Sequence, residues 1–138
     1  MSRLEGQIRG EISEMEVAVE LLEQGCRVSD TIGHSHPYDL IADKDARLLK
    51  IQVKTAKHRG RRKYDIILSN PEKYTEENVD LFAGYARPED EVFFVPFDEI
   101  DKRASVTFTA PEDMGSEANR ERANQANAYT FQKALSRL

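Results

Sequence analysis

The chain has 138 residues, of which 39% are hydrophobic and 33% are charged, and its formal net charge is −5. This length favours a single domain, because two complete hydrophobic cores would be crowded into it. No apolar run approaches the roughly 20 residues that cross a bilayer. The N-terminus has no apolar signal-peptide core, so we expect a protein of the cytoplasm. The excess of acidic residues over lysines suggests a prokaryotic, high-salt source, such as a halophilic archaeon or a virus.

The first predicted element is a helix over about residues 3–24. Ser2 and Glu5 have the spacing of a capping box, and Gly25 fits a helix stop. The apolar residues of this segment recur at helical spacing and predict a stripe that packs on the core. The stripe consists of Leu4, Ile8, Ile12, Met15, Val19 and Leu22.

Two glutamates of this helix lie off its polar side. Glu11 falls inside the apolar stripe, and Glu14 falls on its flank. A carboxylate that faces a core is costly unless it is paired or bound to a metal, so each is a candidate functional residue. A fringe position with access to water, or a change of helix register at Gly10, would also explain them.

Two predicted strands then carry polar residues of complementary chemistry. Residues 38–42 and 48–55 are apolar runs bounded by turn formers, and the five residues between them suit a hairpin loop. Side chains alternate along a strand, so Gln52 and Lys54 share one face. Pairing of the strands brings Asp39 near both. A carboxylate, an amide oxygen and an ammonium on one patch can hold a divalent metal ion and stabilise an anion beside it.

The basic residues concentrate directly downstream. Residues 50–63 contain seven basic and no acidic side chains, a charge of +7, whereas the remainder carries 13 minus 25, or −12. One concentrated basic segment in an acidic chain indicates a local phosphate-binding face. A solvated strand end followed by a flexible loop is the alternative. The candidate nucleic-acid-binding residues are Lys57, Arg59, Arg61, Arg62 and Lys63.

The rest of the chain predicts short strands and a terminal helix. Residues 116–138 have a helix-forming composition but a weak apolar stripe, which suits a C-terminal helix that packs lightly or contacts a partner. The order of elements predicts an α/β (α+β) fold over residues 1–138, with one central mixed sheet flanked by helices. The expected strands span residues 64–68, 79–85, 92–95 and 106–109.

The motifs in order resemble the PD-(D/E)xK nuclease superfamily. Within it, the chain is most similar to small single-domain endonucleases related to cyanobacterial intron-encoded homing enzymes, and more distantly to archaeal Holliday junction resolvases. The resemblance covers roughly residues 8–100 and implies a restriction-endonuclease-like fold. It rests on residues 10–14, 25–28, 38–40, 51–55, 79–83 and 92–96.

The resemblance also implies catalytic roles. Asp39 is similar to the aspartate that bridges the metal, and Lys54 to the lysine that positions or activates the attacking water. Gln52 stands where the superfamily usually has Glu or Asp, and Glu14 matches the helix-borne acid, with Glu11 as the substitute. The expected metal ligands are thus Asp39, Gln52 and Glu14. Because Gln52 removes one negative charge, Mg²⁺ would bind more weakly and Glu14 would matter more.

The implied function is Mg²⁺-dependent hydrolysis of DNA phosphodiester bonds, with Mn²⁺ as a substitute ion. Two alternatives stay open: a structure-specific Holliday junction resolvase, and an inactive DNA-binding or assembly module, for which Gln52 is the best argument. Symmetric cleavage of two strands needs two active sites, so a homodimer or a higher homo-oligomer is expected.

Overall fold

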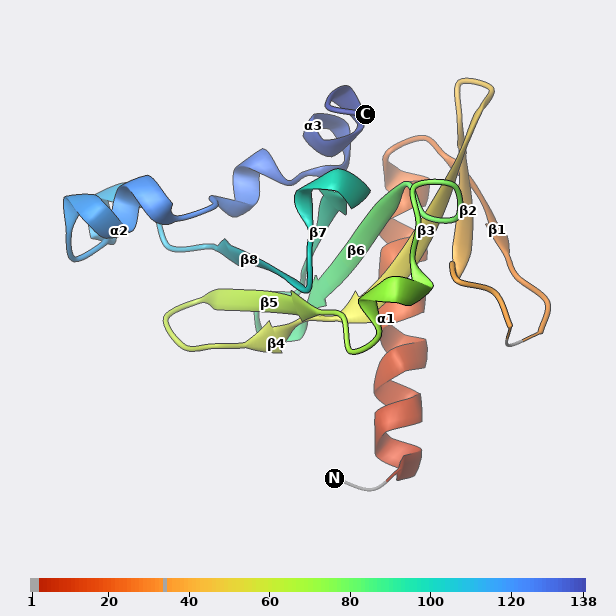
Figure 1. The fold of residues 1–138 in the computed structure, drawn as a ribbon, viewed down its shortest axis with the longest axis horizontal. Helices are drawn as coiled ribbons and strands as arrows, with labels where there is room; N and C mark the ends of the chain where they lie inside the picture. The colour runs from red at the N-terminus through yellow and green to blue at the C-terminus, as the bar shows by residue number, and fades with distance from the viewer. Residues whose placement is uncertain (1–2, 34) are drawn as a thin grey trace.

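Two β-sheets and a set of helices build the protein in the computed structural model, which describes residues 3–33 and 35–138 (Figure 1). The larger sheet has the strand order β1-β2-β3-β6-β7, and the smaller sheet has the order β4-β5-β8. The larger sheet is mixed: β3 and β6 are parallel, whereas the pairs β1–β2, β2–β3 and β6–β7 are antiparallel. The strands are β1 (Arg27–Asp30), β2 (Leu40–Lys44), β3 (Arg47–Thr55), β4 (Lys57–His58), β5 (Lys63–Ile67), β6 (Leu81–Ala86), β7 (Glu91–Pro96) and β8 (Arg103–Thr107), and the helices are α1 (Arg3–Glu23), α2 (Glu117–Arg122) and α3 (Phe131–Ser136).

The larger sheet lies between two hydrophobic clusters. On one face, Val17 and Leu21 of α1 and Phe131 of α3 pack with Ile51 and other strand residues. On the other face, side chains of β6 and β7 pack with Tyr64 and other residues of the smaller sheet. The predicted fold class is therefore confirmed, but two of its details were wrong. The strands form two sheets rather than one, and the helices cover one face while the smaller sheet covers the other.

Helix α1 has the predicted extent but not the predicted orientation. It is continuous from Arg3 to Glu23, so Gly10 does not change its register, and Gly25 follows with a φ of 85°. The predicted capping residue Ser2 lies outside the described residues. The face of α1 that packs on the sheet is built from Ser13, Val17 and Leu21. The predicted apolar stripe points the opposite way and is mostly exposed, so its assignment to the core was wrong.

The hairpin that carries the candidate site is tighter than predicted. Strands β2 and β3 pair up to Lys44 and Arg47, which leaves Asp45 and Ala46 as the turn. Both turn residues have positive φ angles, 51° and 68°, as the tight turns of two-residue hairpins require. Strands β5, β6 and β7 lie close to their predicted positions, β8 begins three residues earlier than predicted, and β1 and β4 were not predicted.

The C-terminal segment is not one helix over residues 116–138, so that prediction was wrong. Ser116 caps α2, and Thr130 caps α3 by accepting a hydrogen bond from the backbone N–H of Lys133. Between them the chain is extended at Ala123 and forms a 3-10 turn at Ala126–Ala128. A second capping residue and a weak apolar stripe favour two short helices over a long one. Within the described residues, no helix is long and apolar enough to span a membrane.

Candidate active site

The contact between α1 and β3 positions the first site residue. The hydroxyl groups of Ser13 and Thr55 lie 2.6 Å apart, and the Ser13 hydroxyl also donates to the Arg9 carbonyl oxygen at 3.0 Å. Ser13 is buried between the helix and the strand. Because Glu14 follows it directly, the Glu14 side chain emerges at the edge of the packed face, half-buried and beside the start of β2.

Asp39 lies where the β2–β3 hairpin opens. Its backbone N–H donates to the Ile51 carbonyl at 2.8 Å, and its Oδ2 accepts from the Val53 N–H at 2.8 Å. The ladder between the two strands therefore continues into the Asp39 carboxylate. This places the carboxylate opposite the segment of β3 that carries Gln52 and Lys54.

The Glu14 and Asp39 carboxyl groups lie next to each other and interact electrostatically. Burial is the main cause that raises the pKa of Glu14 to about 7, and the negative charges of Asp39 and Asp30 add to it. Burial also raises the pKa of Asp39, although the Val53 N–H and the Lys54 charge oppose the rise. Near neutral pH the pair therefore holds a proton for part of the time, and a cation bound between the two groups would displace it.

Gln52 supports Asp39 through its amide nitrogen. This amide is assigned with its nitrogen toward two acceptors, Asp39 Oδ2 at 3.2 Å and the Pro37 carbonyl at 2.8 Å, since its oxygen would otherwise face only acceptors. The Gln52 oxygen therefore points away from Asp39. To act as a metal ligand beside Asp39, Gln52 would have to turn its amide over.

A basic cluster with an aromatic platform lies next to the acidic pair. The ammonium groups of Lys54 and Lys73 lie 5.6 Å and 5.8 Å from the centroid of the Tyr74 ring. Both positive charges lower the pKa of Asp39, though less than burial raises it. Cation–π contact with one nearly buried ring restrains both lysines near the acids. The site thus pairs two carboxyl groups with two cations.

The donor atoms at this place fit a hard cation. Asp39 and Glu14 offer carboxylate oxygens, and the adjacent backbone offers carbonyl oxygens, which are the ligands that Mg²⁺ prefers. Among residues 3–33 and 35–138, no three His, Cys, Asp or Glu side chains form a metal-binding cluster. An ion held here would thus rely on two acids and retained waters, which suits weakly bound Mg²⁺ better than a tightly caged metal.

The structure divides the predicted basic residues into two groups. Arg59 forms an ion pair with the buried Asp65 at 2.9 Å, and Arg62 forms one with Glu89 at 2.6 Å. Within the described part of the chain, the side chains of Lys57, Arg61 and Lys63 have neither an ion-pair nor a hydrogen-bond partner. Two of the five predicted residues are therefore held in ion pairs with acidic side chains of the same chain. The other three present unpaired positive charges.

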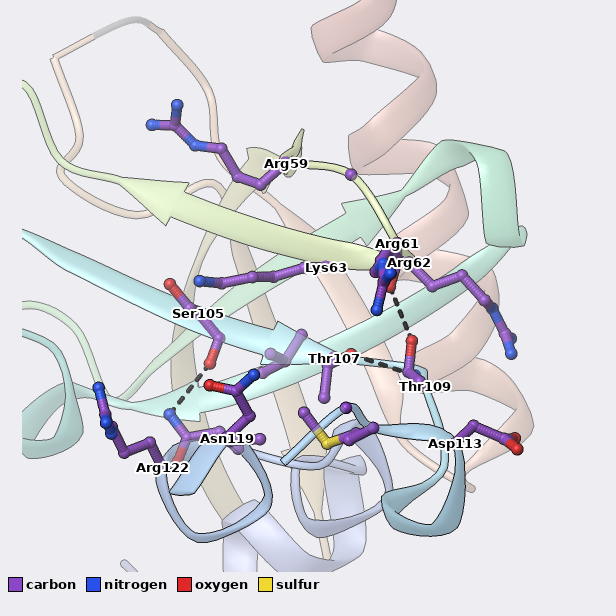
Figure 2. Close-up of a pocket in the computed structure, with 16 residues that line it drawn as sticks. Arg59, Arg61, Arg62, Lys63, Ser105, Thr107, Thr109, Asp113, Asn119 and Arg122 are labelled. Carbon is purple, nitrogen blue, oxygen red and sulfur yellow. Dashed lines mark hydrogen bonds between the residues drawn. The ribbon is translucent and has the colours of Figure 1, made fainter. Parts of the chain in front are cut away.

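A large pocket lies beside this segment, with a volume of about 890 Å³ (Figure 2). Strands β5 and β8 form one side and α2 with its flanking segments forms the other. Lys63, Ser105 and Thr107 line the strand side, while Asn119 and Arg122 line the helical side. The Asn124 amide donates to the Ser105 carbonyl at 3.0 Å and ties the two sides together. Cations and amides from distant parts of the chain thus converge on one concave surface.

Sequence reasoning missed three of these residues. Asp30 ends β1, whose pairing with β2 sets it opposite Leu40 and close to the acidic pair. Lys73 lies in the 3-10 turn Pro71–Lys73, to which the sequence assigned no function, and Arg122 belongs to the expected C-terminal helix. No local pattern marks Lys73 or Arg122, because each reaches its site only through the tertiary fold.

Comparison with known proteins decides the family. Residues 4–132 match the family model described as PD-(D/E)XK endonuclease. The chain belongs to the PD-(D/E)XK endonuclease family. It is therefore a nuclease, and the resemblance read from its motifs is confirmed. No curated protein gives a significant sequence match.

One solved structure shares the fold of this nuclease. The bacterial homing endonuclease I-Ssp6803I superposes with a TM-score of 0.69 at 19% identity, over 95% of this chain and 94% of that one. The Holliday junction resolvase Hjc of the archaeal hyperthermophile Archaeoglobus fulgidus gives a TM-score of 0.48 at 17% identity, over 84% of this chain and 98% of that one. At these identities the first comparison supports the restriction-endonuclease-like fold alone.

Proposed function

We propose that this nuclease is a Mg²⁺-dependent DNA endonuclease that hydrolyses phosphodiester bonds at the Glu14–Asp39 pair. The observation that carries the proposal is the close approach of these two carboxyl groups beside Lys54, where burial and charge act on the pKa of both acids. Two acids in contact repel each other once both are ionised, so the arrangement favours a bound cation. Nucleases of this family usually use divalent metal ions, and Mn²⁺ should substitute for Mg²⁺.

The proposed chemistry assigns a task to each residue. A bound Mg²⁺ would supply Lewis-acid stabilisation of the scissile phosphate and a more acidic water. Asp39 and Glu14 would hold it, and the Val53 N–H keeps the Asp39 carboxylate oriented. Lys54 would stabilise the negative charge that develops on the phosphate. Lys73, restrained on the same tyrosine ring, offers a second cation for the neighbouring phosphate.

DNA is the proposed substrate because unpaired cations flank the site. Lys57 lies on β4, Lys63 on β5 and Arg61 in the turn between them. Arg122 lines the same pocket as Arg61 and Lys63, from its helical side (Figure 2). Contacts from such side chains to phosphates give affinity with little sequence information. Asn119 and the other polar side chains of the pocket have the donor and acceptor chemistry that reads base edges.

One observation favours a second candidate function. Because the Gln52 nitrogen faces Asp39, the site has an amide donor where a third carboxylate would complete a metal centre. A catalytically inactive DNA-binding or assembly module is therefore the alternative. We further propose a homodimer or higher homo-oligomer, since cutting both strands symmetrically needs two active sites.

Cleavage of supercoiled plasmid tests the proposal. The wild-type protein should nick the plasmid with Mg²⁺ or Mn²⁺ and leave it intact with EDTA. A four-way junction and a linear duplex of matched sequence are then compared under the same conditions. If the protein strongly prefers the junction, its function is that of a Holliday junction resolvase rather than of a general endonuclease. DNA binding without cleavage of any substrate would favour the inactive module.

A further inference from the structure

Helix α1 exposes an apolar stripe on the side that faces away from the sheet. Met15 is 68% exposed, Leu4 65%, Leu22 57%, Val19 50% and Ile8 45%. We call these five residues the outer stripe. They occupy the helix face opposite Ser13 and Val17, and Figure 1 shows the first turns of α1 extending beyond the strands. The strongest apolar pattern of the helix thus takes no part in the core of a single chain.

The spacing of the outer stripe is that of a helix–helix seam. Ile8, the half-buried Ile12, Met15, Val19 and Leu22 follow one another at intervals of four, three, four and three residues. This is the alternation by which one helix packs along another over two heptads. A surface meant only for water has no reason to keep that period over four turns.

The charge of α1 argues against two other occupants. The helix contains six glutamates and two arginines, a net charge of −4. Helices that lie on membranes carry lysine and arginine on their polar face, and anionic lipids would repel this one. The DNA backbone would repel it for the same reason. The outer stripe therefore requires a protein surface that is apolar along its centre.

We propose that the outer stripe is a self-association surface on which α1 of a second copy of this chain packs antiparallel. A two-fold axis across the helix makes the stripe its own partner. Arg9 flanks the stripe in its N-terminal half, and Glu16 and Glu23 follow on the same flank at seven-residue intervals. In the antiparallel pair each Arg9 meets this acidic flank of the other copy. A parallel pair would instead set Glu11 of one copy beside Glu16 of the other.

The area of the stripe suits a modest but specific interface. Each of the five side chains exposes on the order of 100 Å² of apolar surface, about 500 Å² in all. This area is as large as the largest apolar patch of a typical monomeric protein, and such patches are often functional. Two copies would bury about 1,000 Å², and the flanking charges extend this toward the size of standard interfaces. The pair would form at micromolar concentrations rather than as an obligate dimer.

This inference rests on the proposed function in one respect only, because the pair would supply the two active sites of symmetric cleavage. Glu14 lies on the flank nearest the sheet and stays clear of the outer stripe. The test therefore measures mass and not cleavage. A failed interface with intact cleavage, and an intact interface without cleavage, are distinguishable results.

The experiment is sedimentation equilibrium of the full chain, without DNA, at about 1 to 100 μM. The test variant is Met15→Glu with Val19→Glu, and the matched control is Ile32→Glu, because Ile32 is 94% exposed and lies outside α1. The test variant should raise the dissociation constant at least about 100-fold and halve the mass, with an unchanged circular dichroism spectrum. The control should keep the wild-type mass.

A charge exchange covers the case in which the double variant does not fold. Arg9→Glu should weaken association about tenfold, and adding Glu16→Arg and Glu23→Arg should restore it. Wild-type protein that stays monomeric throughout the concentration range would overturn the proposal. So would a folded Met15→Glu, Val19→Glu variant of wild-type mass, or a charge exchange that fails to restore association.

Discussion

Glu14 and Asp39 repel each other when both are ionised, and this repulsion links pH, stability and metal binding. The pKa of Glu14 is raised from its ordinary 4.5 to about 7 in the folded protein. A raised pKa means that the folded state holds the proton more tightly than the unfolded state does. The stability gained in this way is complete below pH 4.5 and is lost as the pH rises through 7.

Glu14→Gln should remove this dependence. In EDTA the variant should melt a few degrees above the wild type at pH 8, with a smaller difference at pH 5, measured by thermal unfolding. The same variant should need more Mg²⁺ for cleavage. Glu11→Gln is the matched control, because Glu11 is exposed on the same helix. If the control changes metal dependence and Glu14→Gln does not, the assignment of the helix acid is wrong.

Gln52→Glu tests the amide beside Asp39. Without metal the new carboxylate replaces a hydrogen bond to Asp39 Oδ2 with repulsion, so the melting temperature in EDTA should fall. With Mg²⁺ the added charge should tighten binding, measured by calorimetric titration. Gln52→Asn keeps the amide and serves as the control for packing. Weaker Mg²⁺ binding by Gln52→Glu would show that this side chain does not face the metal.

Lys54→Ala should slow cleavage by two or three orders of magnitude, because it removes a cation from the place where charge develops. The ammonium of Lys54 contacts the Tyr74 ring, so Lys54→Met keeps much of the packing while it removes the charge. Single-turnover rates of the two variants should agree. Near wild-type rates in both would exclude Lys54 from the mechanism.

The hairpin of β4 and β5 and the segment around α2 form the proposed DNA-binding surface together. Arg61→Ala, Lys63→Ala and Arg122→Ala should each weaken binding about equally across sequences and flatten its salt dependence by close to one unit of slope. Arg62→Ala is the control, because Arg62 already pairs with Glu89. Binding is measured by fluorescence anisotropy at several salt concentrations. Unchanged slopes in all three variants would move the DNA surface elsewhere.

Local chemistry in the sequence predicts where a helix ends better than it predicts which face of the helix packs on the core. The end of α1 was predictable because Gly25 supplies a residue that tolerates positive φ. The face of α1 was not, because the outer stripe outnumbers the three buried residues that hold the helix on the sheet. The break in the C-terminal segment was missed for the opposite reason: Thr130 is a capping residue within a composition that favours helix.

For the molecule as a whole, separation along the chain decides what the sequence could predict. Asp39, Gln52 and Lys54 share one hairpin, so alternation and pairing bring them together without knowledge of the rest. The three-stranded sheet depends on β8 returning to β5, and the basic pocket depends on Arg122 returning to Lys63. No periodicity within a segment encodes such long-range contacts, and the family resemblance ended before them.

The central claim is that Asp39 holds the metal with which this nuclease cuts DNA. The most direct test is plasmid cleavage by wild-type protein and Asp39→Asn, compared at equal DNA occupancy over a range of Mg²⁺ and Mn²⁺ concentrations. Asn keeps the shape of the side chain and the acceptor for the Val53 N–H but removes its charge. We predict that cleavage is lost with either ion while DNA binding persists. Cleavage by Asp39→Asn at the wild-type rate would contradict the account.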